Sequence, residues 1–162
     1  MSITSISGGT PASGPSALAA RLNDLATMAE AASKKVHVDY LSDPNTVTRD
    51  LKFGGQRANK VIDGLKALLP DIAVHGGGED GLLLADRAIE QLRTGMGALD
   101  GGIGFGDGVT RASTAKILNE GAPKVAESMF GKAASSLHGI AAIAGFRGLT
   151  DDAFQNAIKL LR

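Results

Sequence analysis

Histidines and paired carboxylates are the side chains of this chain that could bind a metal ion or transfer a proton. The three histidines, His37, His75 and His138, lie 38 and 63 residues apart, so no two of them share a helical turn. We therefore expect no metal site and no cofactor. His138 lies between Leu137 and Ile140 in an apolar stretch, which favours a packed or interfacial histidine over a catalytic one.

Asp151 and Asp152, directly after Thr150, could act as an acid and base pair. Carboxylates in the first turn of a helix also interact favourably with the positive end of the helix dipole. Because threonine is a good N-cap residue, the sequence predicts the start of a helix here rather than a catalytic pair.

The run HGGG at 75–78 resembles the stretch that supplies oxyanion-hole amides in one branch of the α/β-hydrolases. The resemblance implies acyl-transfer chemistry at a serine on a G-x-S-x-G turn, and this pentad does not occur in the chain. We therefore interpret the four residues as a flexible connector between helices, and we expect no catalytic residue and no enzyme activity.

A second glycine-rich stretch, GGIGFGDG at 101–108, could cradle a phosphate with its backbone amides. Its glycines do not fit G-x-G-x-x-G, and the chain's Gly131-Lys132 pair is followed by Ala133 instead of the Ser or Thr of a P-loop. We interpret the stretch as a structural loop, in which Phe105 is the apolar residue available for a contact.

Composition narrows the classes of partner. The 162 residues suffice for one domain with its own core. With 17 basic and 17 acidic residues, the chain has no excess of positive charge with which to bind nucleic acid. It has no cysteine, 22 glycines and only 4% aromatic residues, which favours long, shallow contacts between helices.

The N-terminal stretch, MSITSISGGTPASG at 1–14, is rich in Ser, Thr and Gly and is interpreted as a flexible arm. Residues 15–162 are expected to form a single helical domain. The N-terminus lacks the basic start and apolar core of a signal peptide, and no apolar run reaches the roughly 20 residues of a membrane span. Two locations remain open: the cytoplasm, or export without a cleavable signal peptide. Membership of a particle is a further alternative.

The stretch Asp43–Leu69 carries the clearest helical pattern. Asp43 can cap the helix and Pro44 suits its first position, whereas Pro70 is expected to end it at Leu69. The seam of small and apolar residues steps by three and four, through Val47, Leu51, Gly54, Ala58, Val61, Leu65 and Leu68. Because this spacing by three and four continues across Gly54-Gly55, we expect a close contact with another helix there rather than a break in the helix.

The same spacing predicts further helices at 15–35, from Glu79 to the loop at 101, at 110–120, from Pro123 onward, and from Thr150 to Leu161. The predicted fold is therefore all-α, a bundle of four longer and two shorter helices. An elongated, coiled-coil-like subunit is the alternative.

The most apolar segment is AASSLHGIAAIAGF at 133–146. Three interpretations are open for it: a core helix, a helix buried between subunits, or a segment that inserts shallowly into a membrane. If the segment is interfacial, the contact residues are Leu137, Gly139, Ile140 and Ala144, together with Gly54 and Phe105 elsewhere in the chain.

These observations predict a non-enzymatic helical subunit that self-associates or docks into a larger bacterial or phage assembly, such as a virion or a secretion apparatus. Its partner is protein, as a homo-oligomer or a larger assembly. Two alternatives remain: a secreted effector or membrane-active protein that uses segment 133–146, and a ligand-binding module or enzyme that uses the loop at 101–108.

Overall fold

The computed structural model describes residues 14–38, 42–100 and 111–161. Every regular element within these ranges is an α-helix, which confirms the all-α class. The helices are α1 (Pro15–Lys35), α2 (Pro44–His75), α3 (Glu79–Asp100), α4 (Arg111–Asn119) and α5 (Ala122–Leu161). Residues 1–13 of the N-terminal arm predicted at 1–14, and the glycine-rich loop at 101–108 with Phe105, lie outside the described residues.

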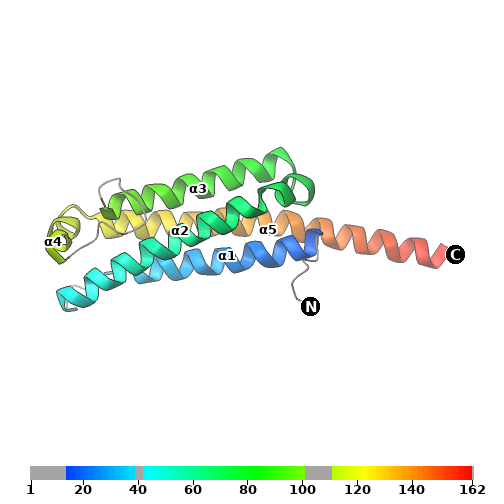
Figure 1. The fold of residues 1–162 in the computed structure, drawn as a ribbon. Helices are drawn as coiled ribbons and strands as arrows, with labels where there is room; N and C mark the ends of the chain where they lie inside the picture. Colours follow the sequence, from blue (N-terminus) through cyan, green and yellow to red (C-terminus); the bar gives the residue numbers. More distant parts are fainter. Residues whose placement is uncertain (1–13, 39–41, 101–110, 162) are drawn as a thin grey trace.

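Four long helices run side by side in alternating directions (Figure 1). Helix α5 packs against α1 and α3, and α2 packs against the same two helices on the opposite side. The short helix α4 lies at the end of the bundle where α5 begins. This is an up-down-up-down bundle, so the bundle prediction is confirmed, whereas the coiled-coil alternative is not.

The core consists of aliphatic and alanine side chains from all four long helices and one phenylalanine. Phe130 of α5 is fully buried and lies over Gly95 of α3, where an added Cβ would be 2.5 Å from the phenylalanine ring. Small residues of this kind let the helices approach closely. The largest fully buried side chains are Phe130, Leu22, Leu51, Leu65, Ile72, Leu92, Leu99, Leu137, Ile140, Val36 and Val61.

Gly54 confirms the prediction of a close contact within α2. The helix continues through Gly54-Gly55 without a break. A Cβ at Gly54 would lie 2.5 Å from the Cγ1 atom of Val36 and 3.3 Å from the carbonyl oxygen of Ala32. The glycine therefore allows the end of α1 to pack on the backbone of α2.

The cap of α2 also agrees with the sequence. One carboxylate oxygen of Asp43 accepts hydrogen bonds from the backbone amides of Asn45 and Thr46, at 2.9 Å and 3.2 Å. The hydroxyl of Thr46 donates to the other oxygen at 2.6 Å. Pro44 follows at the first helical position, where its missing N–H costs nothing.

The predicted end of α2 at Leu69 is wrong, because the helix runs through Pro70 to His75. Proline cannot donate to the carbonyl of Lys66, but Pro70 and Lys66 are exposed, so water can hydrate that group. The turns on either side of the proline bury Leu68 and Ile72. Their packing holds the helix together across the local defect.

The predicted helix start at Thr150 is also wrong. Residues 122–161 form one continuous helix of 40 residues, so the described chain has four long helices and one short one. The hydroxyl of Thr150 donates backward to the carbonyl of Phe146 at 3.0 Å. The side chain therefore bonds within the helix and does not cap a new one.

Candidate protein-interaction surface

Two of the candidate histidines connect α5 with α1 or with the residues directly after it. The Nδ1 atom of His37 lies 3.1 Å from a carboxylate oxygen of Glu127. The ring of His138 contacts Asn23 through Nδ1 at 3.0 Å and Glu30 through Nε2 at 3.1 Å. Both histidines are exposed at the surface of the bundle. Among the described residues, no group of three or more potential ligands could hold a metal ion.

The HGGG run forms the turn between α2 and α3. His75 is the last residue of α2, and Gly77 and Gly78 have φ angles of +96° and +61°, a left-handed region that glycine adopts without strain. A Cβ at Gly81 would collide with the carbonyl of Gly76. These glycines therefore serve a tight reversal of the chain, as the connector interpretation requires.

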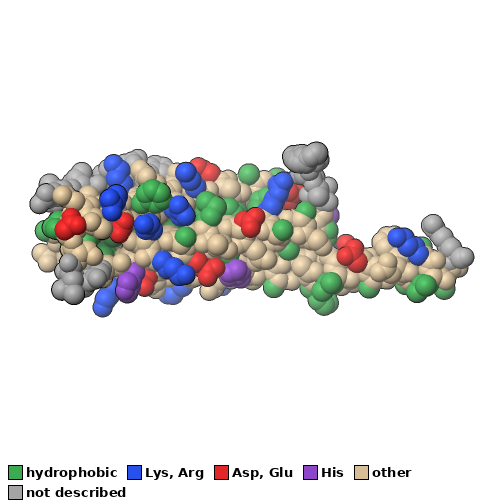
Figure 2. All heavy atoms as spheres, turned by 90° about the horizontal axis from the view of Figure 1, so that it is seen from below, with side chains coloured by type: hydrophobic (Ala, Val, Ile, Leu, Met, Phe, Trp, Pro, Cys, Tyr) green, Lys and Arg blue, Asp and Glu red, His purple; other side chains and the backbone are tan. Residues whose placement is uncertain are grey.

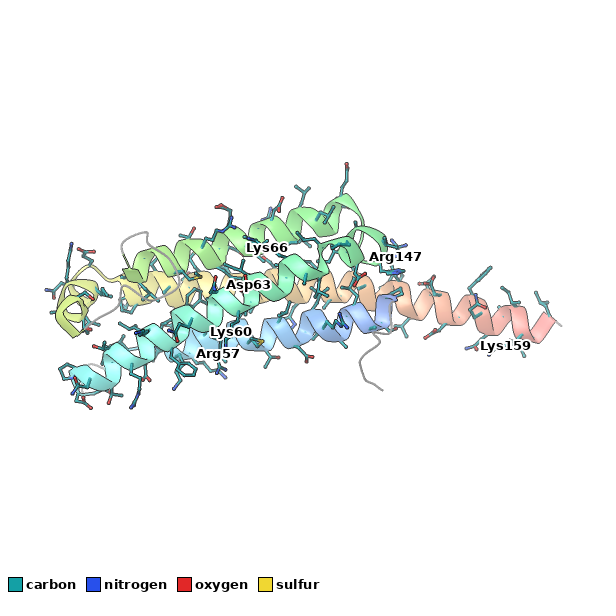
Figure 3. The ribbon with its side chains drawn as sticks, in the orientation of Figure 1. Arg57, Lys60, Asp63, Lys66, Arg147 and Lys159 are labelled. Atoms are coloured by element: carbon teal, nitrogen blue, oxygen red, sulfur yellow. The ribbon has the colours of Figure 1, made fainter. Side chains whose placement is uncertain are left out.

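A row of charged side chains follows the outer face of α2, with Arg57, Lys60, Asp63 and Lys66 one turn apart (Figure 3). The guanidinium of Arg57 lies 5.2 Å from the ring centroid of Phe53, a cation–π contact. Asp63 interrupts the positive charge in the middle of the row. The row is a solvated helix face rather than a site that concentrates positive charge on an anion.

The described hollows are small or shallow. The hollow beside His37, at the join of α1 and α2, has a volume of about 140 Å³, less than the ~300–1,000 Å³ of ligand pockets. Another has a volume of about 340 Å³, and the described residues that line it, including Leu82 and Leu83, all belong to α3. A single helix supplies no opposing wall, so this second hollow is an open depression.

The residues that we selected in segment 133–146 lie within the bundle. Leu137, Ile140 and Ala144 are fully buried in the core. Gly139 is half-buried, and a Cβ there would meet Leu84 of α3 at 3.7 Å. Gly54 lies in the contact between α1 and α2 described above. The buried apolar side chains of this segment thus pack on α1 and α3, whereas Phe146 at its end is exposed.

The exposed apolar residues lie farther along α5. Gly148 is the last buried residue of the helix, and a Cβ there would collide with Ser16 at the start of α1. Beyond this contact α5 projects from the bundle (Figure 1). From Leu149 to Leu161 every residue is exposed except the half-buried Ile158. The projecting part is about 20 Å long.

One side of the projecting helix is apolar. Nine large hydrophobic residues are exposed in the described chain, and five of them lie between Phe146 and Leu161. Figure 2 shows hydrophobic side chains along one edge of this helix and charged side chains toward the other. We call this surface the C-terminal face; its residues are Phe146, Leu149, Ala153, Phe154, Ala157, Ile158, Leu160 and Leu161.

The C-terminal face points away from the core seam of α5. Phe146 follows the buried Ala144 by two residues, which is about 200° around a helix. The helices that cover Leu137 and Ala144 therefore could not cover Phe146, even if they were longer. Among the described residues, no element outside α5 buries the side chains of the projecting part.

This surface was not predicted from the sequence, because the cap signal at Thr150 predicts a helix boundary there. The boundary separated Phe146 and Leu149 from the apolar residues that follow. The signal was present, since the positions 146, 149, 153, 157 and 160 step by three and four. This row lies on the opposite side of the helix from the core seam, and such a change of side indicates a second surface.

Comparison of the chain with protein-family models, with curated proteins and with solved structures found no match. Within the described residues, none of the helices has the combination of length and apolar character that crossing a bilayer requires.

Proposed function

We propose that the protein is a non-enzymatic helical interaction subunit that assembles with protein through the C-terminal face of α5. The observation that carries this proposal is the concentration of large apolar side chains on a helix that projects from the bundle. Leu160 and Leu161 are each 88% exposed, and Phe146 and Leu149 are each 71% exposed. Contiguous exposed apolar surface of this kind marks interaction sites.

The distribution of aromatic residues supports the same function. The described chain has four phenylalanines, and two of them, Phe146 and Phe154, lie on the C-terminal face. Phe130 fills the core, and Phe53 is overlaid by Lys35 and Arg57. Aromatic side chains dominate the binding energy of many protein interfaces. A chain so poor in aromatics places half of the described ones where no other described element buries them.

The charges of the projecting helix favour protein over an anionic membrane. Helices that lie in membrane interfaces carry many lysines and arginines on their polar face. Between 146 and 161, Arg147 and Lys159 are balanced by Asp151 and Asp152. A polar face with no net charge gains nothing from anionic lipid headgroups, whereas it is compatible with a protein partner.

The test compares the full chain with the triple variant Leu149→Asp, Phe154→Asp and Leu160→Asp. Light scattering from micromolar to millimolar concentration, with electron microscopy of the same samples, should show the wild type above its chain mass of 16.5 kDa. The triple variant should remain at that mass and keep the helical circular dichroism of the bundle, with a loss no larger than the contribution of the projecting part.

Leu83→Asp is the matched control, because Leu83 is 65% exposed on α3, outside the C-terminal face. It should assemble as the wild type does. The proposal fails if the wild type is monomeric throughout and binds no protein that the triple variant fails to bind. It also fails if the wild type and the triple variant assemble equally.

A further inference from the structure

We propose that the C-terminal face of α5 pairs with the same face of a second copy of this chain, in an antiparallel contact with Ala153 on the two-fold axis. This inference depends on the proposed function and specifies its partner. Three features of the face support this pairing: the order of its large and small side chains, its charges and its area.

The order of side chain sizes favours the antiparallel direction. With Ala153 opposite its own copy, Leu149 meets Ala157 of the second copy and Phe146 meets Leu160. Large residues then face small ones in the middle of the contact, as a well-packed interface requires. In a parallel pair each residue would meet itself, so Ala153 and Ala157 would leave two adjacent gaps and Phe146 would crowd its copy.

The charges favour the same direction. Residues 146–153 contain Arg147, Asp151 and Asp152, a net charge of −1, and residues 154–161 contain Lys159, a net charge of +1. Figure 3 shows Arg147 where α5 leaves the bundle and Lys159 near its tip. An antiparallel pair places the negative half of each helix beside the positive half of the other, and it also opposes the two helix dipoles.

The area of the face is sufficient for a specific but weak dimer. The contact would bury the two phenylalanines and three leucines of each copy. Counted over both copies, this removes on the order of 1,000 Å² of apolar surface from water. Specific, stable interfaces bury about 1,200–2,000 Å² in total, and weak or transient ones less, so this contact lies just below the range of stable interfaces. The equilibrium between monomer and dimer should therefore shift as the protein concentration is varied from micromolar to millimolar.

The other occupant within reach is the segment 1–13 of the same chain, because α1 begins beside Gly148. Its large apolar residues are only Met1, Ile3 and Ile6. Three such side chains cannot match the eight residues of the C-terminal face. A second copy supplies an equal number of apolar residues, and therefore fits better.

Single cysteines can test the pairing directly, because the chain has no cysteine of its own. Under mild oxidation, Ala153→Cys alone should form a covalent dimer. Phe146→Cys and Leu160→Cys should each form little dimer alone, and a mixture of the two should form several-fold more. A cysteine at Leu83 is the control for random collision and should remain monomeric.

Each other outcome overturns the inference in a distinguishable way. If Leu160→Cys alone forms as much dimer as Ala153→Cys, the pair is parallel and the direction is wrong, while the proposed function stands. If the wild type is monomeric at millimolar concentration but binds a different protein through the C-terminal face, self-pairing is wrong and the proposed function again stands. A disulfide within one chain between Ile6→Cys and Ala153→Cys would identify the N-terminal segment as the occupant. A dimer that the triple aspartate variant leaves intact would overturn both proposals.

Discussion

At the scale of single residues, glycines set the distances between helices, and Gly54 is the strictest case. Alanine at a helical glycine normally gains about 1 kcal/mol in helix propensity. At Gly54 the new Cβ would lie 2.5 Å from Val36, a β-branched side chain that is fully buried and cannot turn away. Overpacking costs ~1–3 kcal/mol, so Gly54→Ala should lower the unfolding free energy by about 1 kcal/mol in urea denaturation.

Gly139→Ala is the matched substitution at a helical glycine with room. Its Cβ would meet Leu84 at 3.7 Å, an ordinary van der Waals contact. We expect the unfolding free energy to rise by about 0.5–1 kcal/mol, measured in the same denaturation series. Equal effects of the two substitutions would contradict the close approach of α1 to α2 at Gly54.

The Asp43 cap should make part of the stability dependent on pH. Hydrogen bonds from the hydroxyl and the amide of Thr46 hold the pKa of the Asp43 carboxyl below its ordinary value of 3.8. The folded state therefore binds the proton less tightly than the unfolded state. The cap stabilises the fold fully above the ordinary pKa, and this contribution disappears as the pH falls through the lower native pKa.

The substitution Asp43→Asn isolates this effect, because asparagine can still accept the two amide bonds but does not titrate. Melting temperatures measured between pH 7 and pH 2 should fall less steeply for the variant than for the wild type. Parallel curves for the two proteins would show that the carboxylate charge does not contribute to the cap.

At the scale of helices, α2 shows how packing overrides a local stop signal. Pro70 removes one backbone hydrogen bond and is exposed, so its ring contributes little burial. Pro70→Ala should raise the unfolding free energy by about 1–2 kcal/mol, since an interior proline costs ~3 kcal/mol and its rigidity in the unfolded chain returns up to ~1 kcal/mol. Urea denaturation can measure this gain.

Pro44→Ala is the control at the start of the same helix. Proline suits this position, so alanine there should bring no gain and should slightly destabilise the protein. A loss of stability in Pro70→Ala would mean that the proline ring itself stabilises the end of α2.

The sequence predicted the helix type, the cap at Asp43 and the close contact at Gly54, because each depends on local chemistry and regular spacing. It failed at Pro70 and Thr150, where a local signal favours a helix boundary. Ile72 beyond the proline and Gly148 before the threonine are buried by other helices, and no local pattern reports that packing. The wrong boundary at Thr150 also hid the C-terminal face, although its spacing by three and four is present in the sequence.

The projecting part of α5 should be stable only when it is covered. Helices of fewer than about 12–15 residues are marginal in water without tertiary contacts, and residues 149–161 have almost none. Hydrogen exchange at micromolar concentration should therefore be much faster in Ala153–Leu161 than in the buried segment Leu137–Ala144. Protection of the projecting part should rise with protein concentration as the face becomes paired.

The triple aspartate variant provides the reference for this measurement. Its projecting part should exchange rapidly at every concentration, while its bundle should exchange as in the wild type. If the wild-type projecting part is strongly protected even when dilute, a segment of the same chain covers it.

At the scale of the whole molecule, stability and association should be carried by different parts of the chain. The buried residues of α5 end at Gly148, so a chain shortened to residues 1–148 keeps every described core contact. At micromolar concentration its unfolding free energy should lie within about 1 kcal/mol of the full chain's, as is usual for changes away from the core.

The shortened chain should nevertheless stay monomeric at concentrations where the full chain assembles, as sedimentation equilibrium can show. Stability and association are linked only through the partner. The C-terminal face is turned away from the core seam, so it stabilises the fold only when a partner covers it. At high concentration the full chain should therefore melt at a higher temperature than the shortened one, and the difference should vanish on dilution. A shortened chain that is much less stable even when dilute would show that residues 149–161 support the bundle itself, and the exposed face would then not be free to bind.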